Sequence, residues 1–232
     1  MSNVFWKDQY REKSQSMDPL AQAGRDVRVG AIPLLHRIHT VIERLQVEPE
    51  DTVIDIGCAN GLVDIVLSST CKSLIAVDVV PEQCALAQIN LASYSNVTVL
   101  QGSATNIPAA DHSADRILML EALQYLDVNE YMVAFAEIMR IAAPGALALI
   151  GSVPDNAKKA AFLEPYLMEL RSAGHLSSAQ KAAAIARNEN CRWYDQQELL
   201  DAWLQLGAKP TILSIPSTDP VADHRFDLLV QL

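Results

Sequence analysis

The sequence is poor in positive charge and has no long apolar run, and each lack excludes a class of partner. Eighteen lysines and arginines stand against 28 aspartates and glutamates, which gives the 232 residues a formal net charge of −10. Such a surface repels phosphate backbones, so we expect no nucleic-acid partner. No apolar stretch reaches the roughly 18 residues of a membrane helix, so we expect no membrane partner.

Cysteine and histidine spacing gives no sign of disulfides or of a metal. The cysteines form no C-x-x-C pair and lie mostly in apolar segments, as reduced packing residues do (Cys58, Cys71, Cys84 and Cys191). His36 and His39 are three residues apart but have no third ligand in view, and we predict no metal site. The first residues are polar and charged from residue 7 onward, unlike a secretory signal, so we expect a cytoplasmic location.

The composition that is present suits a single folded domain. Hydrophobic residues make up 50% of the chain and charged residues 20%, which excludes general disorder. A chain of this length can bury a substantial core, and we predict one domain over residues 1–232. Within it we expect an arm or lid (1–30), a ligand-binding core (47–155), a helical insertion over the substrate (156–194), and a last helix with terminal strands (195–232).

The stretch Thr52 to Gly61, TVIDIGCANG, joins an apolar strand to a helix through a turn of small residues. Its first part is a β-branched run interrupted by one carboxylate, Asp55, as in a buried parallel strand. Gly57 and Gly61 let the backbone bend sharply and approach a ligand. Free amides at the start of the helix stabilise anionic groups. We therefore predict that this turn holds a small adenosine-containing cofactor.

The spacing of this turn argues against a dinucleotide. The fingerprint that cradles a pyrophosphate is G-x-G-x-x-G, whereas this chain reads D-x-G-x-A-x-G, with Leu62 in place of the last glycine. Ala59 disfavours a positive φ, so the loop must either keep φ negative there or accept modest strain. A NAD-dependent dehydrogenase stays an alternative, because it shares the strand, the turn and the helix.

Strands and helices alternate after the turn. Residues 73–78 predict a second strand that ends in Asp78, 21 residues beyond Gly57, where an acidic side chain accepts hydrogen bonds from ribose hydroxyls. Val79 follows and offers an apolar surface to adenine. Further strands are expected at 97–101, 116–120, 147–150, 211–215 and 226–230, and helices at 32–45, 62–67, 81–91, 131–139 and 195–206. The last two strands have a short connection, which implies a hairpin.

These segments resemble, in order and spacing, the motifs of the class I S-adenosylmethionine-dependent methyltransferases, and in particular their small-molecule, type 11-like group. The family's first motif is D-x-G-x-G-x-G, and Ala59 replaces its middle glycine. Residues 102–104, GSA, resemble a G-D-A triplet that caps the adenine, with serine for aspartate. Residues 107–115 resemble I-P-x-x-D-x-S-x-D, and residues 140–150 resemble the entry to the fifth strand.

The resemblance implies an enzyme of the α/β class. Its fold would be a Rossmann-like, doubly wound, seven-stranded sheet, mostly parallel with one antiparallel C-terminal strand and helices on both faces. Its cofactor would be S-adenosyl-L-methionine, with S-adenosyl-L-homocysteine as the product. The residues expected to bind the cofactor are Asp55, Gly57, Ala59, Gly61, Asp78, Val79, Ser103, Ala104 and Glu121. Because Ser103 lacks a charge, weaker selectivity for adenine is expected.

The chemistry of such an enzyme is mostly alignment. The methyl group on a sulfonium is already a good electrophile, so a nucleophile must be held about 3 to 3.5 Å from it. A hydroxyl acceptor also needs a base, and the candidates are Tyr125, Asp155 and His224. Each of them has another interpretation. Tyr125 could be an aromatic cover over the sulfonium, Asp155 could cap a helix, and His224 could be an exposed residue of the hairpin. Arg25 and Arg28 could pair with a ligand carboxylate or lie on the surface.

Two absences narrow the acceptor. Residues 121–125, EALQY, replace the N/D-P-P-Y/F sequence of methyltransferases that act on amino groups of bases and glutamines. Met119 and Leu120 offer no acidic ligands for a metal-dependent, catechol-type enzyme. Over most of its length the chain is similar to small bacterial methyltransferases of polysaccharide or natural-product biosynthesis. We expect methyl transfer to an oxygen of a small molecule, such as a sugar; N- or C-methyl transfer and a non-catalytic scaffold are alternatives.

Overall fold

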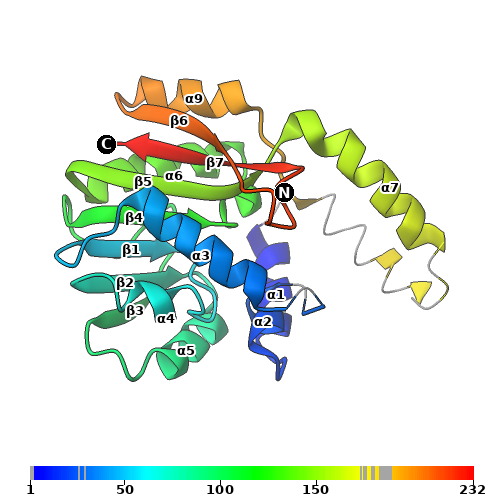
Figure 1. The fold of residues 1–232 in the computed structure, drawn as a ribbon, viewed down its shortest axis with the longest axis horizontal. Coiled ribbons are helices and arrows are strands. Elements are labelled where there is room, and N and C mark those ends of the chain that lie inside the picture. The colour runs from blue at the N-terminus through cyan, green and yellow to red at the C-terminus, as the bar shows by residue number, and fades with distance from the viewer. Residues whose placement is uncertain are drawn as a thin grey trace.

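Within the described residues of the computed structural model, seven strands form one sheet in the order β3-β2-β1-β4-β5-β7-β6 (Figure 1). The structure describes residues 3–25, 27–28, 30–172, 174, 177–178, 181–182 and 190–232, without the side chains of residues 3 and 4. The strands are β1 (Thr52–Ile56), β2 (Ser73–Asp78), β3 (Val97–Gln101), β4 (Ala114–Leu120), β5 (Ala142–Pro154), β6 (Lys209–Ser214) and β7 (Arg225–Gln231). Neighbouring strands among β1 to β5 pair in parallel, and β7 is antiparallel to β5 and β6. The predicted sheet is confirmed.

Helices cover both faces of the sheet. The helices are α1 (Asn3–Lys13), α2 (Pro19–Gln22), α3 (Ile32–Leu45), α4 (Asp64–Leu67), α5 (Pro81–Asn90), α6 (Val128–Ile141), α7 (Lys159–Ser172) and α9 (Gln196–Gln205), with short turns of 3-10 helix, η1 (Leu123–Tyr125) and η2 (Asn156–Lys158). Side chains alternate along each strand, so Ile54 packs toward α6 and α9 while Val53 packs toward α3 and α4. The doubly wound arrangement is therefore also confirmed.

The core on the α6 side contains the largest buried side chains. Trp203 of α9 stacks on Phe135 of α6 with ring centroids 4.2 Å apart, and both side chains are fully buried. Asp127 begins α6 with a capping box in which the side chain of Glu130 accepts the Asp127 amide. Asp195 caps α9 by accepting the amides of Gln197 and Glu198, as its position before an apolar run predicts. These caps fix the helices that lie beneath the strand ends.

Several elements differ from the sequence-based expectations. The polar N-terminal segment contains a helix, α1, and α4 is shorter than the expected 62–67. β5 is much longer than 147–150, because its end continues beside β7. α7 runs through Pro165, although a proline inside a helix usually bends or ends it. Phe162 and Tyr166 stack across this proline at 6.0 Å, and their contact supports the helix where the proline removes a hydrogen bond.

α7 projects from the body of the molecule beyond the ends of β5 and β7 (Figure 1). It begins the predicted helical insertion, of which residues 183–189 and several earlier positions lie outside the described residues. Among the described residues, no helix is long and apolar enough to cross a membrane. The arm, insertion and cytoplasmic location stay predictions.

Candidate active site

A cavity that is partly open to solvent lies at the carboxyl ends of β1, β2, β3 and β4. In a sheet of this kind that edge is where ligands bind. Of the nine residues predicted to bind the cofactor, all except Gly61 line this cavity, and Tyr125 lines it too. The structure therefore brings together residues that are up to 70 positions apart in the chain. We call it the cofactor cavity.

The turn after β1 forms the floor of the cofactor cavity. Gly57 has a φ of +86°, and a Cβ there would lie 2.8 Å from the Cβ of Ala122. Ala59 has a φ of +49°, so of the two alternatives the loop accepts the strain. Gly61 has a φ of +80° and faces Leu91, which a Cβ would approach to 2.9 Å. Gly61 thus shapes the turn and lets the turn pack against residues next to α5, whereas Gly57 and Ala59 face the cavity.

Asp78 lies at the end of β2, where an acidic side chain was predicted to accept hydrogen bonds from ribose hydroxyls. Its carboxylate accepts the amides of Ala59 and Val80, both at 2.9 Å, and so ties the ends of β1 and β2 together. Burial raises the pKa of Asp78, although these amide donors act in the opposite direction. A carboxylate has about four acceptor positions, and the Val79 amide also donates to this one, so one remains for a ligand. Val79 lies beside it in the wall of the cavity.

Ser103 and Ala104 line the end where the adenine was predicted. The Ser103 hydroxyl accepts the Thr105 amide at 3.2 Å and lies 2.9 Å from the Thr105 hydroxyl. Thr105 therefore competes with a ligand for this oxygen, and the expected weak selectivity for adenine stays a prediction.

Glu121 and Arg25 form an ion pair in the opposite wall. Their closest atoms are 3.2 Å apart, and Glu121 adopts a φ of +56° at the end of β4. Burial alone would raise the pKa of Glu121, but the guanidinium groups of Arg25, Arg225 and Arg37 outweigh it and hold the pKa below its usual value. Glu121 is therefore ionised at neutral pH. Arg25 lies in the cavity, whereas Arg28 does not line it.

α1 covers the cofactor cavity with Trp6, Lys7 and Tyr10, which the sequence analysis did not single out. The hydroxyls of Tyr10 and Tyr125 are 3.0 Å apart, and the ring centroids of Trp6 and Tyr125 are 4.2 Å apart. Gln83 holds α1 in place by donating to the Tyr10 carbonyl at 3.0 Å. The four-residue spacing of Trp6 and Tyr10, which puts both on one face of a helix, was the signal for this cover.

Of the three candidate bases, Tyr125 alone lines the cofactor cavity. Burial raises the pKa of Tyr125, so its hydroxyl keeps its proton. Asp155 accepts the Ala157 amide and the Gln196 side chain, both at 3.0 Å, and so acts as the cap of η2. The ring of His224 stacks on Phe162 at 4.0 Å, and burial followed by the nearby Arg225 lowers its pKa to about 4. Asp155 and His224 thus lie outside the cavity walls.

A second cavity, which is open to solvent, adjoins the first, and we call it the outer cavity. The two share Trp6, Tyr125 and Leu126. The outer cavity is completed by side chains of η1, α6 and α7 and of the segment before α9 (Gln124, Asp127, Val128, Lys159, Asn190, Cys191, Arg192 and Trp193). A molecule in the outer cavity would reach the cofactor past Tyr125.

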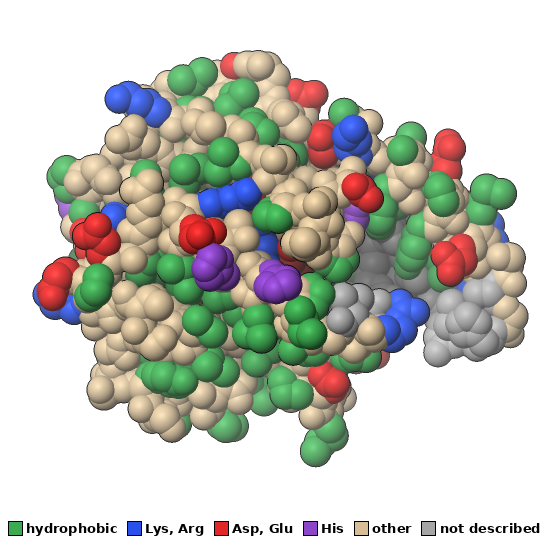
Figure 2. Space-filling model, in the orientation of Figure 1, with side chains coloured by type: hydrophobic (Ala, Val, Ile, Leu, Met, Phe, Trp, Pro, Cys, Tyr) green, Lys and Arg blue, Asp and Glu red, His purple; other side chains and the backbone are tan. Residues whose placement is uncertain are grey.

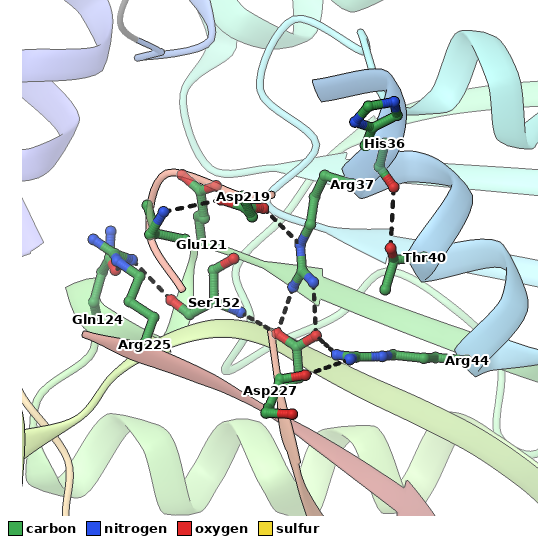
Figure 3. Close-up of polar contacts among 12 residues, drawn as sticks. His36, Arg37, Thr40, Arg44, Glu121, Gln124, Ser152, Asp219, Arg225 and Asp227 are labelled. Atoms are coloured by element: carbon green, nitrogen blue, oxygen red, sulfur yellow. Dashed lines mark hydrogen bonds and ion pairs between the residues drawn. The ribbon is translucent and has the colours of Figure 1, made fainter. Parts of the chain in front are cut away.

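Beside these cavities, Asp227 of β7 is the centre of a buried polar network (Figure 3). Arg37 and Arg44, both from α3, donate to its carboxylate, and so does the Ser152 amide at 2.7 Å. Arg225 donates to the Ser152 carbonyl at 2.7 Å and to the Gln124 side chain. The network connects α3, β5 and β7 to the 3-10 turn that carries Tyr125.

The described residues contain no group of three or more His, Cys, Asp and Glu side chains that could hold a metal ion. His36 and His39 are exposed on α3, where two histidine side chains stand together on the molecular surface (Figure 2). His39 lies 3.4 Å from Glu43, one helical turn further on.

Comparison with known proteins agrees with this geometry. Residues 54–150 match a family model described as a methyltransferase domain. No match was found among curated proteins. A phosphoethanolamine N-methyltransferase of Haemonchus contortus, solved with phosphoethanolamine and S-adenosylhomocysteine, superposes with a TM-score of 0.74 at 16% identity, over 100% of this chain and 50% of that one.

Two further solved structures have the same fold. One is a complex of the Haloferax volcanii Trm112 methyltransferase activator with a methyltransferase (TM-score 0.65, 20% identity, 94% of this chain and 99% of that one). The other is a geranyl diphosphate C-methyltransferase of Streptomyces coelicolor, solved with geranyl diphosphate, Mg²⁺ and S-adenosylhomocysteine (TM-score 0.64, 13% identity, 95% and 87%).

Proposed function

We propose that the chain is a class I S-adenosylmethionine-dependent methyltransferase of the type 11 group, and that it methylates an oxygen atom of a small molecule bound in the outer cavity. The observation that carries this proposal is that the two cavities meet at Tyr125. S-Adenosylmethionine is the cofactor, so the dehydrogenase alternative is set aside. The remaining question is which acceptor lies next to the cofactor's methyl group.

The residues of the cofactor cavity have distinct roles in this proposal. Bound S-adenosylmethionine supplies an electrophilic methyl group on its sulfonium. Asp78 would bind the ribose with its remaining acceptor position, and Val79, Ser103 and Ala104 would surround the adenine. Glu121 and Arg25 face the methionine moiety with opposite charges, as its ammonium and carboxylate require. Trp6 and Tyr125 close the space around the sulfonium and exclude water.

Tyr125 orients the acceptor. Because its pKa is raised by burial, it donates a hydrogen bond to the acceptor oxygen and leaves another lone pair of that oxygen free to attack. Of the carboxylates that line the two cavities, Asp78 and Asp127 accept backbone amides, Glu121 pairs with Arg25, and Asp55 is buried against Asp64. The site thus favours an acidic oxygen, such as that of a phenol or a carboxylate, over a sugar hydroxyl that needs a strong base.

Nitrogen and carbon are the two alternative acceptor atoms, because one of the solved structures is an N-methyltransferase and another a C-methyltransferase. A panel of phenols, carboxylic acids, sugars, amines and prenyl compounds, incubated with methyl-labelled cofactor and analysed by mass spectrometry, separates them. We expect label on oxygen. Label found on nitrogen or carbon alone would contradict the proposal.

The role of Tyr125 has its own test. With the acceptor found in the panel, Tyr125→Phe should lower kcat about tenfold to a hundredfold, because a positioning hydrogen bond is lost, and should leave affinity for S-adenosylhomocysteine nearly unchanged. Tyr94→Phe, a change of the same size in a side chain that packs near α5, is the control. Equal kcat in the two variants would show that the Tyr125 hydroxyl does not contribute to methyl transfer.

A further inference from the structure

Two buried carboxyl groups lie against one another beneath the cofactor turn. Asp55 of β1 is 3% exposed and lines the cofactor cavity, and Asp64, the first residue of α4, is fully buried behind it. The two side chains are close enough to share a hydrogen bond when one of them carries a proton. Other residues shape the cofactor turn, so its conformation does not require either carboxyl group.

No positive charge compensates this pair. Within the described part of the chain, neither carboxyl group takes part in an ion pair, and Asp64 has no hydrogen-bond donor nearby except its own amide and a protonated Asp55. One oxygen of Asp55 is likewise buried without a donor. The other titratable groups that face the pair are acidic as well: Asp78 from β2, Cys58 from the turn, and Cys71 from the segment after α4.

Ionising two carboxyl groups that are in contact inside a protein costs much more free energy than ionising them in water. Burial and mutual repulsion both favour the protonated form. Burial, and then the neighbouring Asp64, raise the pKa of Asp55 well above its usual value. Burial raises the pKa of Asp64 to about 7. At neutral pH the pair therefore holds a proton between its two carboxyl groups.

We propose that Asp64 is a positioning residue that shares this proton with Asp55, and that binding of the cationic cofactor releases it. The inference rests on the cofactor assigned above. S-Adenosylmethionine brings a sulfonium and an ammonium group to a cavity whose floor contains Asp55. A nearby cation favours the ionised carboxylate, so the O–H bond of the pair breaks, the proton passes to solvent and the pair becomes fully anionic.

Cofactor affinity should rise with pH, because binding releases a proton. The pair binds its proton more tightly in the free protein than in the complex, so cofactor affinity rises with pH between the two pKa values and is flat outside them. The steepest rise that one proton allows is about tenfold per pH unit. S-Adenosylhomocysteine lacks the sulfonium charge, so it should release less of the proton than S-adenosylmethionine does.

Calorimetric titration of the full chain at pH 7, in phosphate and in Tris buffer, counts the protons released on binding. We expect release with S-adenosylmethionine and a smaller release with S-adenosylhomocysteine. In Asp64→Asn the amide donates permanently to Asp55, so the extra release disappears and affinity changes less with pH. Asp51→Asn, at the opposite end of β1 and paired with Arg116, is the control and should behave like the parent protein.

Two results would overturn the inference. One is a proton count that is the same in Asp64→Asn and in the parent protein, and the other is cofactor binding without proton release between pH 6 and 8. Should Asp64→Asn not fold, the comparison of the two ligands in the parent protein decides, since equal proton release also refutes the inference. Failure of S-adenosylmethionine to bind at all would instead contradict the cofactor assignment.

Discussion

At the scale of the residue, the cofactor turn contains an alanine in a conformation that favours glycine. The φ of +49° at Ala59 brings its amide to Asp78 at 2.9 Å, so the strained backbone makes the link between β1 and β2. A left-handed residue with a Cβ costs about 1 kcal/mol relative to glycine. The unfolded chain gains conformational freedom from a glycine, which offsets part of this difference.

Ala59→Gly should therefore leave the free energy of unfolding within about 1 kcal/mol of the parent value, despite removing a side chain from a partly buried turn. Ala85→Gly, in the exposed face of α5, is the control and should cost about 1 kcal/mol, because that position is helical. Urea unfolding measures both. A greater loss at position 59 than at position 85 would show that the left-handed backbone carries no strain.

The place of a single residue could be predicted where the residue lies at or near a strand end. Asp55 is the last residue but one of β1, Asp78 ends β2 and Glu121 follows β4, and the sheet brings all three to one cavity. Asp155 and His224 also stand near strand ends, but their neighbours in space, Gln196 and Phe162, come from segments whose positions the sequence does not reveal. Prediction failed where the environment of a residue depends on distant contacts.

At the scale of the element, Asp227 connects α3 to β5 and β7. Its carboxylate is fully buried and accepts hydrogen bonds from Arg37, Arg44 and the Ser152 amide. Arg37 is itself only 2% exposed. Ser152 has a φ of +57° where the pairing of β5 with β7 is irregular. The bulge thus turns the Ser152 amide to a carboxylate instead of leaving it in the regular ladder.

Asp227→Ala should lower the free energy of unfolding by about 3 to 5 kcal/mol, because it leaves Arg37 buried without its partner. Asp219→Ala is a matched control, since Asp219 is 4.0 Å from Arg37 and less buried, and it should cost less than about 1 kcal/mol. The measurement is denaturant unfolding of each variant. Similar losses from the two variants would contradict a central role for Asp227.

The elements themselves were largely predictable because apolar runs and turn residues mark their bounds. β2 and β3 agree with prediction to the residue, and α5 differs by one residue at its end. α1 was not predicted as a helix because its residues show no continuous apolar stripe beyond the four-residue spacing of Trp6 and Tyr10. Its contacts with Tyr125 and Gln83 explain why it is ordered. α7 continues through Pro165 because of aromatic contacts that a local pattern does not contain.

At the scale of the whole molecule, the N-terminal arm is part of the ligand site and contributes little to the sheet. Buried Asn60 in the cofactor turn donates to the Pro19 carbonyl at 2.9 Å and to Gln22 at 3.1 Å, and Gln83 donates to the carbonyls of Tyr10 and Gln22. These side chains fasten α1 and α2 over the cofactor cavity. The two large apolar clusters contain no residue of α1 or α2.

A chain that begins at Met17 should therefore keep the sheet but lose the cover of the cavity. We expect an unchanged far-ultraviolet spectrum apart from the missing helix, and an affinity for S-adenosylhomocysteine at least about tenfold lower, or 1.4 kcal/mol. Calorimetry measures the affinity, and thermal unfolding without ligand serves as the control for the fold. Affinity within twofold of the full chain would show that α1 does not contribute to binding.

The hydrogen bonds that hold α1 over the cavity have a consequence for the reaction cycle. Each round must exchange S-adenosylhomocysteine for a fresh donor, and the used molecule lies beneath Trp6 and Tyr10. Breaking the contacts of Tyr10 with Gln83 and Tyr125 would then precede every exchange. Steady-state turnover would be set by product departure, and the first methylation would occur as a rapid burst before the slower steady state.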